Sequence, residues 1–287
     1  MKYLNLGCGA RYHPAWTNID IAPHGFGVIA HDLSAGIPLP DASFDVVYHS
    51  NVLEHMRRAD ARPFMRECYR VLRPGGVLRV GVPDLERMSN LYLKTLHAAL
   101  SGDVHAAYDY EWMMLELYDQ TVRERSGGGM LSWLAQDPLP NEAFVYERIG
   151  EEGRSLVQSL RRRSSVMSKQ SRHLSLRRIA RRLRTLPASF RRRLVAALLG
   201  PADINALDIG RFRLAGEVHH WMYDRYSLAK LMLEVGFRDP IEQTPTASQI
   251  PDWSSFRLDV SPDGAVVKPD SLFMEAIKPS EAVGGQI

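Results

Sequence analysis

A glycine-rich bend directly after a short apolar run constrains the fold of this chain more than any other feature. Tyr3 to Leu6 has the length and apolar content of a buried strand, and Gly7-Cys8-Gly9 ends it at once. Two glycines one residue apart allow a sharp backbone turn and leave no side chain between the main chain and a ligand. In an open α/β sheet, ligands bind beyond the carboxyl ends of the strands. The bend is therefore either an ordinary tight turn or one wall of a ligand site.

Strand and helix signals alternate after this bend. Leu53 to Leu72 has the apolar spacing of a helix and is followed by Pro74-Gly75-Gly76, a typical end signal. Short apolar runs flanked by turn residues predict further strands at residues 17–21, 28–30, 43–49 and 77–82. Strands separated by crossover segments favour an α/β fold with a doubly wound, mostly parallel sheet.

The link between the bend and the second strand is short. Ten residues separate Gly9 from Asp20, whereas a parallel crossover needs about a dozen or more. We therefore expect a loop or a single turn from Arg11 to Trp16, lying over the ligand site. A dinucleotide fingerprint requires a third glycine that opens a full helix, and Tyr12 stands in its place, which argues against a nicotinamide enzyme.

Basic residues are concentrated in one segment. The net charge is +3, but residues 154–193 contain no Asp or Glu and hold 14 of the 36 Lys and Arg residues, which leaves 22 against 33 acidic residues elsewhere. Within it, apolar residues recur every three to four positions over 176–194, as in a basic amphipathic helix. Three interpretations remain open: a cap helix that is solvated or docked on the body, a contact with an anionic membrane surface, or a contact with nucleic acid. The continuous apolar stripe favours the first two over single-stranded RNA.

The cysteines and the hydropathy exclude several other classes. Two cysteines make no disulfide framework, and the His and Asp residues lack the spacing of a metal-ligand set, so no metal is predicted. No signal-peptide core and no apolar run of about 18 residues are present, so we expect a chain that is neither exported nor membrane-spanning. A cytoplasmic location follows, with peripheral contact at the inner membrane face left open through residues 176–194.

Six motifs follow one another along the chain: Leu4-Asn-Leu-Gly-Cys-Gly9, Asn18-Ile-Asp-Ile21, His31-Asp-Leu33, Phe44-Asp-Val-Val47, Asn51-Val-Leu-Glu-His55 and Val71-Leu-Arg-Pro-Gly-Gly76. In this order they resemble the class I S-adenosylmethionine (SAM)-dependent methyltransferases with a methyltransferase type 11 domain. The resemblance covers residues 1–86 and returns near 226–278. It implies a Rossmann-like, seven-stranded, mostly parallel sheet formed by residues 1–86 and 211–287. Residues 87–210 would form a helical cap between the fifth and sixth strands, with the basic segment 154–193 inside it.

The resemblance assigns cofactor roles to residues at the strand ends. The bend would approach the methionine part of SAM, with the Cys8 amide exposed, and Ser50 and Asn51 would line the same side. Asp20 would accept hydrogen bonds from the ribose hydroxyls, and Asp32 from the adenine amino group, with hydrophobic contacts from Ile21 and Leu33. The cofactor-binding set is thus Gly7, Cys8, Gly9, Asp20, Ile21, Asp32, Leu33, Ser50 and Asn51. For Asp20 a surface turn, for Asp32 a helix N-cap, and for Ser50 and Asn51 ordinary turn positions are the alternatives.

One position departs from the family pattern. The family usually has an acid two residues before the first glycine, and this chain has Asn5. The carbonyl oxygen of Asn5 can still accept a hydrogen bond from the cofactor's ammonium group, but without a full charge.

Candidates for catalysis and substrate binding are polar residues near the predicted cofactor site. An alcohol acceptor needs a nearby base, and histidine is the usual one. The catalytic candidates are His55, His219 and Asp84, each with a structural hydrogen bond as the alternative. The substrate-binding candidates are Asp119, Gln120, Arg123 and Tyr223; the first three share a helical face that could equally be an exposed salt-bridged surface.

The sequence therefore predicts an enzyme that transfers a methyl group from SAM to an oxygen or nitrogen of a small molecule, a sugar or a lipid-linked glycan. The glycan preference follows only from the resemblance and the basic segment. The alternative is a SAM-fold module without catalysis that docks to membrane or RNA through residues 176–194. The acceptor and the oligomeric state are not indicated by the sequence.

Overall fold

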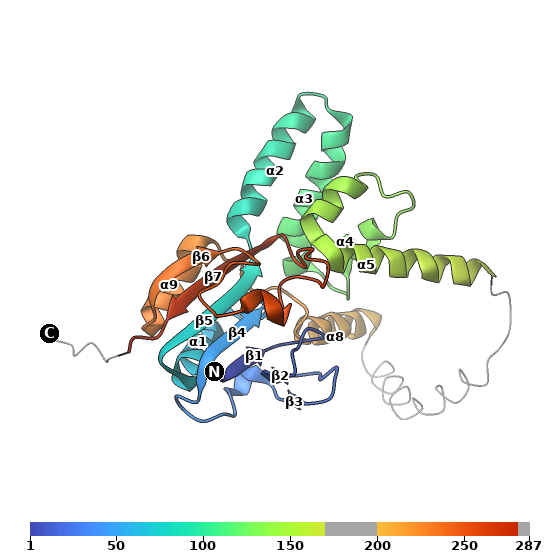
Figure 1. Cartoon of the computed structure of the whole chain (residues 1–287). Helices are drawn as coiled ribbons and strands as arrows, with labels where there is room; N and C mark the ends of the chain where they lie inside the picture. The colour runs from blue at the N-terminus through green and yellow to red at the C-terminus, as the bar shows by residue number, and fades with distance from the viewer. Residues whose placement is uncertain (170–199, 281–287) are drawn as a thin grey trace.

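The computed structural model describes residues 1–169 and 200–280. Seven strands form one sheet in the order β3-β2-β1-β4-β5-β7-β6 (Figure 1). The strands are β1 (Tyr3–Leu6), β2 (Thr17–Asp20), β3 (Val28–Ala30), β4 (Phe44–Ser50), β5 (Leu72–Pro83), β6 (Arg238–Gln243) and β7 (Ser271–Ile277). All neighbours are parallel except β7, which pairs antiparallel with both β5 and β6. The predicted α/β fold with a seven-stranded, mostly parallel sheet is confirmed.

The glycine-rich bend lies at the centre of the carboxyl edge of the sheet. Leu6, the last residue of β1, pairs with Ile19 of β2 on one side and with His49 of β4 on the other. The bend is therefore flanked by the ends of β2 and β4. From β1 the chain first adds strands on one side, β2 and β3, and then crosses to the other side with β4, so the bend lies at the point where the strand order reverses. This is the position at which open α/β sheets bind ligands.

The short link from β1 to β2 contains no helix, as expected from its length. Two buried asparagines hold it instead. The side-chain amide of Asn5 donates to the carbonyl of Arg11 (3.0 Å), and that of Asn18 donates to the carbonyls of His13 and Trp16 (3.0 and 2.8 Å). The loop is fixed by side chains because it is too short to satisfy its backbone groups within a helix.

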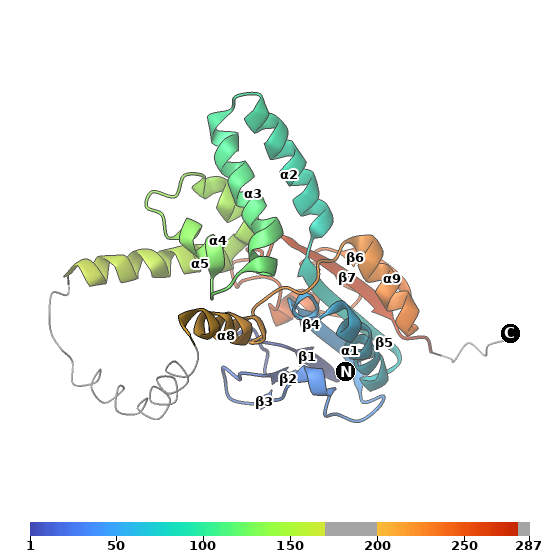
Figure 2. The same ribbon diagram turned by 180° about the vertical axis from the view of Figure 1, so that it is seen from behind.

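The two faces of the sheet are covered differently. Helices α1 (Arg58–Val71) and α9 (Arg225–Val235) pack on one face, where Leu6, Val47 and Leu78 belong to the largest apolar cluster (Figure 2). On the other face the segment around the 3-10 helix η3 (Trp253–Phe256) covers Tyr48 and Trp16 with aromatic side chains. A loop with aromatic residues thus does on this face what a crossover helix does in a regular doubly wound sheet.

The predicted helix from Leu53 to Leu72 is wrong in its first turns. The chain forms a 3-10 turn, η2 (Leu53–His55), and then extends at Met56 (ψ 143°) and Arg57 (ψ 150°) before α1 begins. The helix ends at Val71, and β5 already starts at Leu72, so the Pro-Gly-Gly sequence lies within the strand rather than before it. The apolar spacing continues through η2 and α1 because both bury apolar side chains in the same cluster.

Helical segments occupy the chain between β5 and α9. They are α2 (Leu85–Leu100), α3 (Val104–Val122), α4 (Gly128–Leu134), α5 (Glu142–Lys169) and α8 (Pro201–Arg213). Figure 1 shows α2 and α3 as an antiparallel pair that projects away from the sheet. Helices α2 to α5 share a separate apolar cluster that includes Met88, Trp112 and Val145. The division into a core of residues 1–86 and 211–287 and a cap of residues 87–210 remains a prediction.

Most of the basic segment, including residues 176–194, lies outside the described residues. The membrane and nucleic-acid interpretations of that segment therefore remain predictions. Within residues 1–169 and 200–280, no helix has the length and apolar character needed to cross a membrane.

Candidate active site

A cavity of about 740 Å³ opens at the carboxyl edge of the sheet, beside the bend. The residues that the sequence places on the methionine side of a cofactor all line it: Gly7, Cys8, Gly9, Ser50 and Asn51. The end of β4 is shaped for this, because Asn51 adopts a positive φ of 54° and its amide donates to the carbonyl of Gly81 on β5 (2.9 Å). Two neighbouring strand ends thus contribute to a single wall.

The two glycines of the bend serve different purposes. Both have positive φ, 62° at Gly7 and 52° at Gly9. A Cβ on Gly7 would lie 2.4 Å from the Cγ2 of Val52, so this glycine lets β1 pack against the residues after β4. A Cβ on Gly9 would meet nothing within 4 Å, so this glycine faces open space in the cavity. That bare backbone fits a ligand that approaches the main chain closely.

The expectation of an exposed Cys8 amide is wrong. This amide donates to the carbonyl of Ile19 (3.2 Å), and the Gly9 amide donates to Oδ2 of Asp20 (2.7 Å). Both donors are consumed in tying the bend to β2, because the bend continues the pairing of the two strands. Burial raises the pKa of the Cys8 thiol to about 11, so this cysteine is not a thiolate nucleophile.

Asn5 lines the cavity in a way that suits an ammonium group. Its Nδ2 donates to Arg11 and to Oδ1 of Asn18 (3.2 Å), whereas its own Oδ1 has no hydrogen-bond partner among the described residues. The carboxamide orientation is therefore fixed by the protein, and one acceptor atom is left for a ligand. This supports the role inferred for Asn5 in place of the usual acid.

The residues predicted to hold the ribose and adenine are not grouped as closely. The Asp20 carboxylate lies beside the bend and also accepts from the Ala22 amide (2.8 Å), but Asp20 is not among the residues that line the large cavity. Asp32 caps the 3-10 turn η1 (Leu33–Ala35) by accepting from the Ser34 amide (2.9 Å). The side chain of Ile21 is exposed, and Leu33 lines a second cavity of about 360 Å³. Their cofactor contacts remain predictions.

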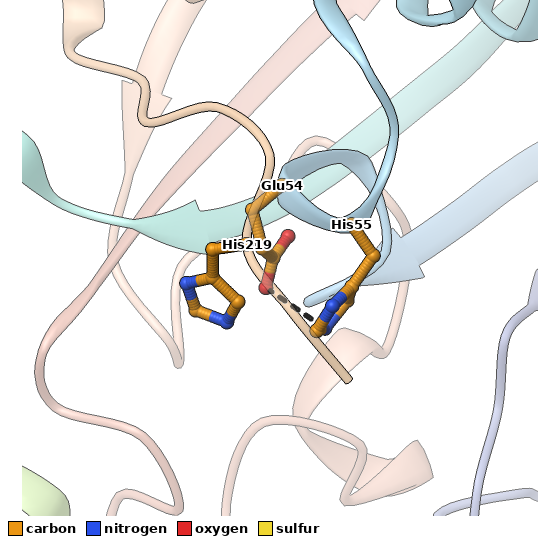
Figure 3. A group of neighbouring side chains, drawn as sticks. All are labelled: Glu54, His55 and His219. Carbon is orange, nitrogen blue, oxygen red and sulfur yellow. Dashed lines mark ion pairs between the residues drawn. The ribbon is translucent and has the colours of Figure 1, made fainter. Parts of the chain in front are cut away.

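Two of the three catalytic candidates meet in one cluster with a third residue, Glu54 (Figure 3). The rings of His55 and His219 are 4.8 Å apart between centroids, and Nε2 of His55 lies 3.9 Å from Oε1 of Glu54. One ligand-type atom from each residue lies within 4.8 Å of the other two. We call Glu54, His55 and His219 the His–Glu cluster.

Backbone pairing brings these distant segments together. The carbonyl of Glu54 accepts from the amides of His220 (2.7 Å) and Trp221 (3.2 Å), and the amide of His219 donates to the carbonyl of Gln120 (2.9 Å). The segment before α9 is thereby held between η2 and the end of α3. Glu54 was missed at the sequence level because it stands in an apolar run and its partner His219 comes from far along the chain.

Desolvation dominates the electrostatics of the His–Glu cluster. Burial raises the pKa of Glu54 to about 7. Burial, together with the neighbouring His55, lowers the pKa of His219 to about 2, and burial also lowers that of His55. Both imidazoles are therefore neutral at physiological pH. Neutral imidazoles can accept a proton or hold a cation.

The third catalytic candidate, Asp84, does not join this cluster. Its carboxylate caps α2 by accepting from the Arg87 amide (3.0 Å), and it lines a different cavity of about 340 Å³. A catalytic role for Asp84 remains a prediction.

The candidate substrate residues mostly pair with one another or with the protein. Asp119 and Arg123 form a buried ion pair (2.7 Å), and Arg123 also binds Glu217 (2.9 Å). The side-chain amide of Gln120 lies 3.1 Å from Nε2 of His219, and Tyr223 is buried. The predicted helical face is salt-bridged but not exposed. Gln120 contacts the His–Glu cluster, whereas direct substrate contacts by the four residues remain a prediction.

Helix α5 adds cavity residues that the sequence did not indicate. The helix is kinked at Gly150 (φ 58°), where a Cβ would lie 2.7 Å from the carbonyl of Val266. This close approach docks α5 against the loop before β7 and places Glu151 and Glu152 on the cavity wall, opposite the bend. Lys268 lines the same cavity and forms an ion pair with Glu152 (3.5 Å).

Comparison with known proteins assigns the N-terminal part of the chain. Residues 4–80 match a family model described as "Methyltransferase domain". Over 56 residues the chain is 52% identical to a probable S-adenosylmethionine-dependent methyltransferase of Mycolicibacterium smegmatis, which covers 20% of this chain and 21% of the relative. A Mycobacterium tuberculosis protein with the same description is 52% identical over 50 residues, 17% of this chain and 18% of the relative.

Among solved structures, a SAM-dependent methyltransferase from Thermotoga maritima overlaps 96% of this chain and 82% of its own, with 13% identity and a TM-score of 0.38. This weak overlap carries no conclusion on function.

The matched residues hold the bend, β1 to β4, α1 and most of β5, in the strand order described above. Residues 4–80 are therefore similar to a methyltransferase domain, and the relatives that match this part of the chain are named as probable SAM-dependent methyltransferases. Both relatives are named for SAM as their cofactor. The alignments span about a fifth of the length of these relatives, so the activity of the whole protein is a proposal.

Proposed function

We propose that this protein transfers a methyl group from SAM to an oxygen, or to a nitrogen, of a small-molecule, sugar or lipid-linked glycan acceptor. The observation that carries the proposal is the convergence of Gly9, Asn5 and Asn51 on one cavity, within the part of the chain that matches the methyltransferase domain. The bare backbone at Gly9 and the free Oδ1 of Asn5 offer space and an acceptor to an amino-acid moiety.

The chemistry asks mainly for positioning. The sulfonium of SAM is an activated methyl donor, so the protein's contribution is to hold the acceptor in line with it and to exclude water. The cavity is lined by polar side chains, including Tyr12, His13, Glu151 and Glu152, which suit an acceptor rich in hydroxyl groups. This lining supports oxygen over nitrogen as the acceptor atom.

An acceptor hydroxyl must lose its proton as the methyl group arrives. Glu54 and His55 follow Asn51 by three and four residues. None of the cluster residues lines the cavity of about 740 Å³, but Lys268, which does, is close enough to influence the pKa values of Glu54, His55 and His219. We assign the activation of the acceptor oxygen to this cluster.

Isothermal titration with SAM and with S-adenosylhomocysteine tests the proposal. We expect both to bind the full-length protein with one site per chain. Gly9→Ala should abolish or strongly weaken binding, because its Cβ enters the cavity. Gly102→Ala is the matched control: Gly102 has a similar positive φ of 89° and an equally open surrounding, but it lies in the turn between α2 and α3. Absence of binding to both compounds by the folded wild type would remove the enzyme assignment.

A further inference from the structure

We propose that Glu54, His55 and His219 form a binding site for a divalent transition-metal ion of the zinc type. Two imidazole nitrogens and one carboxylate oxygen are the ligand set of catalytic zinc sites, whereas magnesium and calcium prefer oxygen ligands alone. The three residues come from η2 and from the segment before α9, and the sheet edge brings them together (Figure 3).

The distances are close to those that a metal requires. Ligand atoms around a tetrahedral zinc ion at about 2.0–2.1 Å are separated by about 3.4 Å. In the structure the three donor atoms lie within 4.8 Å of one another, and the His55 to Glu54 distance is 3.9 Å. An ion would have to draw these donor atoms closer together than they lie in the structure.

Burial of Glu54 is the independent observation that points to a cation. Its side chain is 0% exposed, and neither carboxylate oxygen has a hydrogen-bond partner within 3.5 Å, although Asn51 and Lys268 lie close enough to favour its charged form. Among the described residues, the 3.9 Å approach of His55 is its only contact within ion-pair distance. A desolvated carboxylate without a partner is costly, so buried carboxylates are normally paired or bound to a metal. No Lys or Arg among the described residues is in direct contact with this carboxylate, and a divalent ion would supply that contact.

The surrounding residues orient the histidines as ligands. Nδ1 of His55 lies 3.3 Å from the carbonyl of Val218, so it donates there and directs the lone pair of Nε2 towards Glu54. Metal-bound histidines usually donate their second ring nitrogen in this way. The side-chain nitrogen of Gln120 lies 3.1 Å from Nε2 of His219, whose Nδ1 is buried without a partner; for Nδ1 to bind an ion, the Gln120 amide must turn so that its oxygen accepts from Nε2–H.

A route for the ion and an open position are present. The side chain of His55 is 28% exposed and lines the cavity of about 360 Å³ together with Leu33. With three protein ligands, a tetrahedral ion keeps one position for water or an acceptor oxygen, whose pKa it lowers. This use of the ion rests on the proposed function, whereas its binding does not.

Metal titration of the full-length protein, dialysed against EDTA and then against buffer, tests the proposal. We expect one Zn²⁺ per chain by calorimetry and by elemental analysis, an increase in melting temperature with Zn²⁺, and much weaker binding of Mg²⁺. Glu54→Gln and His219→Gln should each weaken Zn²⁺ binding by about 100-fold or more, because loss of even an outer-sphere partner costs 10–100-fold. His97→Gln, on the exposed side of α2, is the matched control and should bind as the wild type does.

The visible spectrum of bound Co²⁺ provides a readout that does not depend on variant stability. The wild type should show the intense bands of a tetrahedral site with nitrogen ligands. Failure of the folded wild type to bind Zn²⁺, or unchanged binding by both cluster variants, overturns the metal site. S-adenosylhomocysteine titration of the same samples separates the two proposals. If the protein binds S-adenosylhomocysteine but not Zn²⁺, only the metal site is overturned. If it binds Zn²⁺ but not S-adenosylhomocysteine, only the methyltransferase proposal is overturned.

Discussion

Asp20 has a structural role and a predicted ligand role, and the sequence alone does not distinguish them. Its carboxylate accepts from the amides of Gly9 and Ala22, so it fixes the bend to the end of β2. The same carboxylate is the predicted partner of the ribose hydroxyls. Each oxygen has a second lone pair, so an anchoring role and a ligand role are compatible at this one residue.

Substitution of Asp20 separates the two tasks. Asp20→Asn keeps an acceptor oxygen for Gly9 but removes the charge, so we expect the affinity for S-adenosylhomocysteine to fall by about 1–3 kcal/mol with little change in melting temperature. Asp20→Ala should lower both. Asp103→Asn, which changes the N-cap of α3, is the control and should leave affinity unchanged. Wild-type affinity in Asp20→Asn would mean that the ribose lies elsewhere.

At the scale of elements, Arg79 connects β5 to its surroundings. Its fully buried guanidinium binds Glu275 on β7 (2.8 Å) and Asp259 in the loop after η3 (2.8 Å), and it lies over the ring of Trp253. Tyr48 on β4 donates to the same Asp259 (2.6 Å). This network fastens the aromatic loop to the face of the sheet that lacks a crossover helix.

Removal of Arg79 should therefore be strongly destabilising. Arg79→Met leaves two buried carboxylates without a counter-charge, and we expect a loss of about 3–5 kcal/mol in the free energy of unfolding, measured by urea denaturation. Arg73→Met, which breaks the partly exposed pair with Asp45, should cost no more than about 1 kcal/mol. A similar decrease in the free energy of unfolding in both variants would show that the buried network contributes no more to stability than the partly exposed ion pair.

At the scale of the whole molecule, Asp270 lies where the helical segments meet the sheet. Its carbonyl accepts from the Asp84 amide (3.0 Å), directly before α2. Burial and the carboxylate of Glu116 on α3 raise the pKa of Asp270 to about 6, against the opposing effect of Arg148 on α5. The fold thus favours the protonated form of this carboxyl group.

The sign of the pH dependence follows from this raised pKa. Between about pH 4 and pH 6 the native state holds a proton on Asp270 that the unfolded chain has released, so this group makes stability fall as the pH rises. Asp270→Asn removes this dependence. We expect the variant to gain about 1–2 kcal/mol relative to the wild type between pH 4 and pH 8 in urea denaturation, discounted for the partial exposure of the side chain. A constant difference across this range would contradict the assignment.

Local sequence patterns predicted the strands well where turn residues flank a short apolar run. The bounds of β3 match the predicted strand at residues 28–30, and those of β2 and β4 differ from the predictions by no more than one residue at each end, because turn residues flank these short apolar runs. The break at Met56 and Arg57 was not predictable, because both flanking segments bury apolar side chains with the same spacing. The hydrogen bond from the Cys8 amide to the carbonyl of Ile19 was not predictable either, because it depends on the register of β1 with β2.

The sequence by itself determined the class of fold and the place of the ligand site, because glycine spacing and strand length act over a few neighbouring residues. Only the tertiary structure decided the His–Glu cluster. His55 and Val218, 163 residues apart, come into contact because β5, the helical segments and α9 return the chain to the same sheet edge. Burial there, which no local pattern encodes, raises the pKa of Glu54 to about 7 and leaves its carboxyl oxygens without a hydrogen-bond partner, the observation on which the proposed metal site rests.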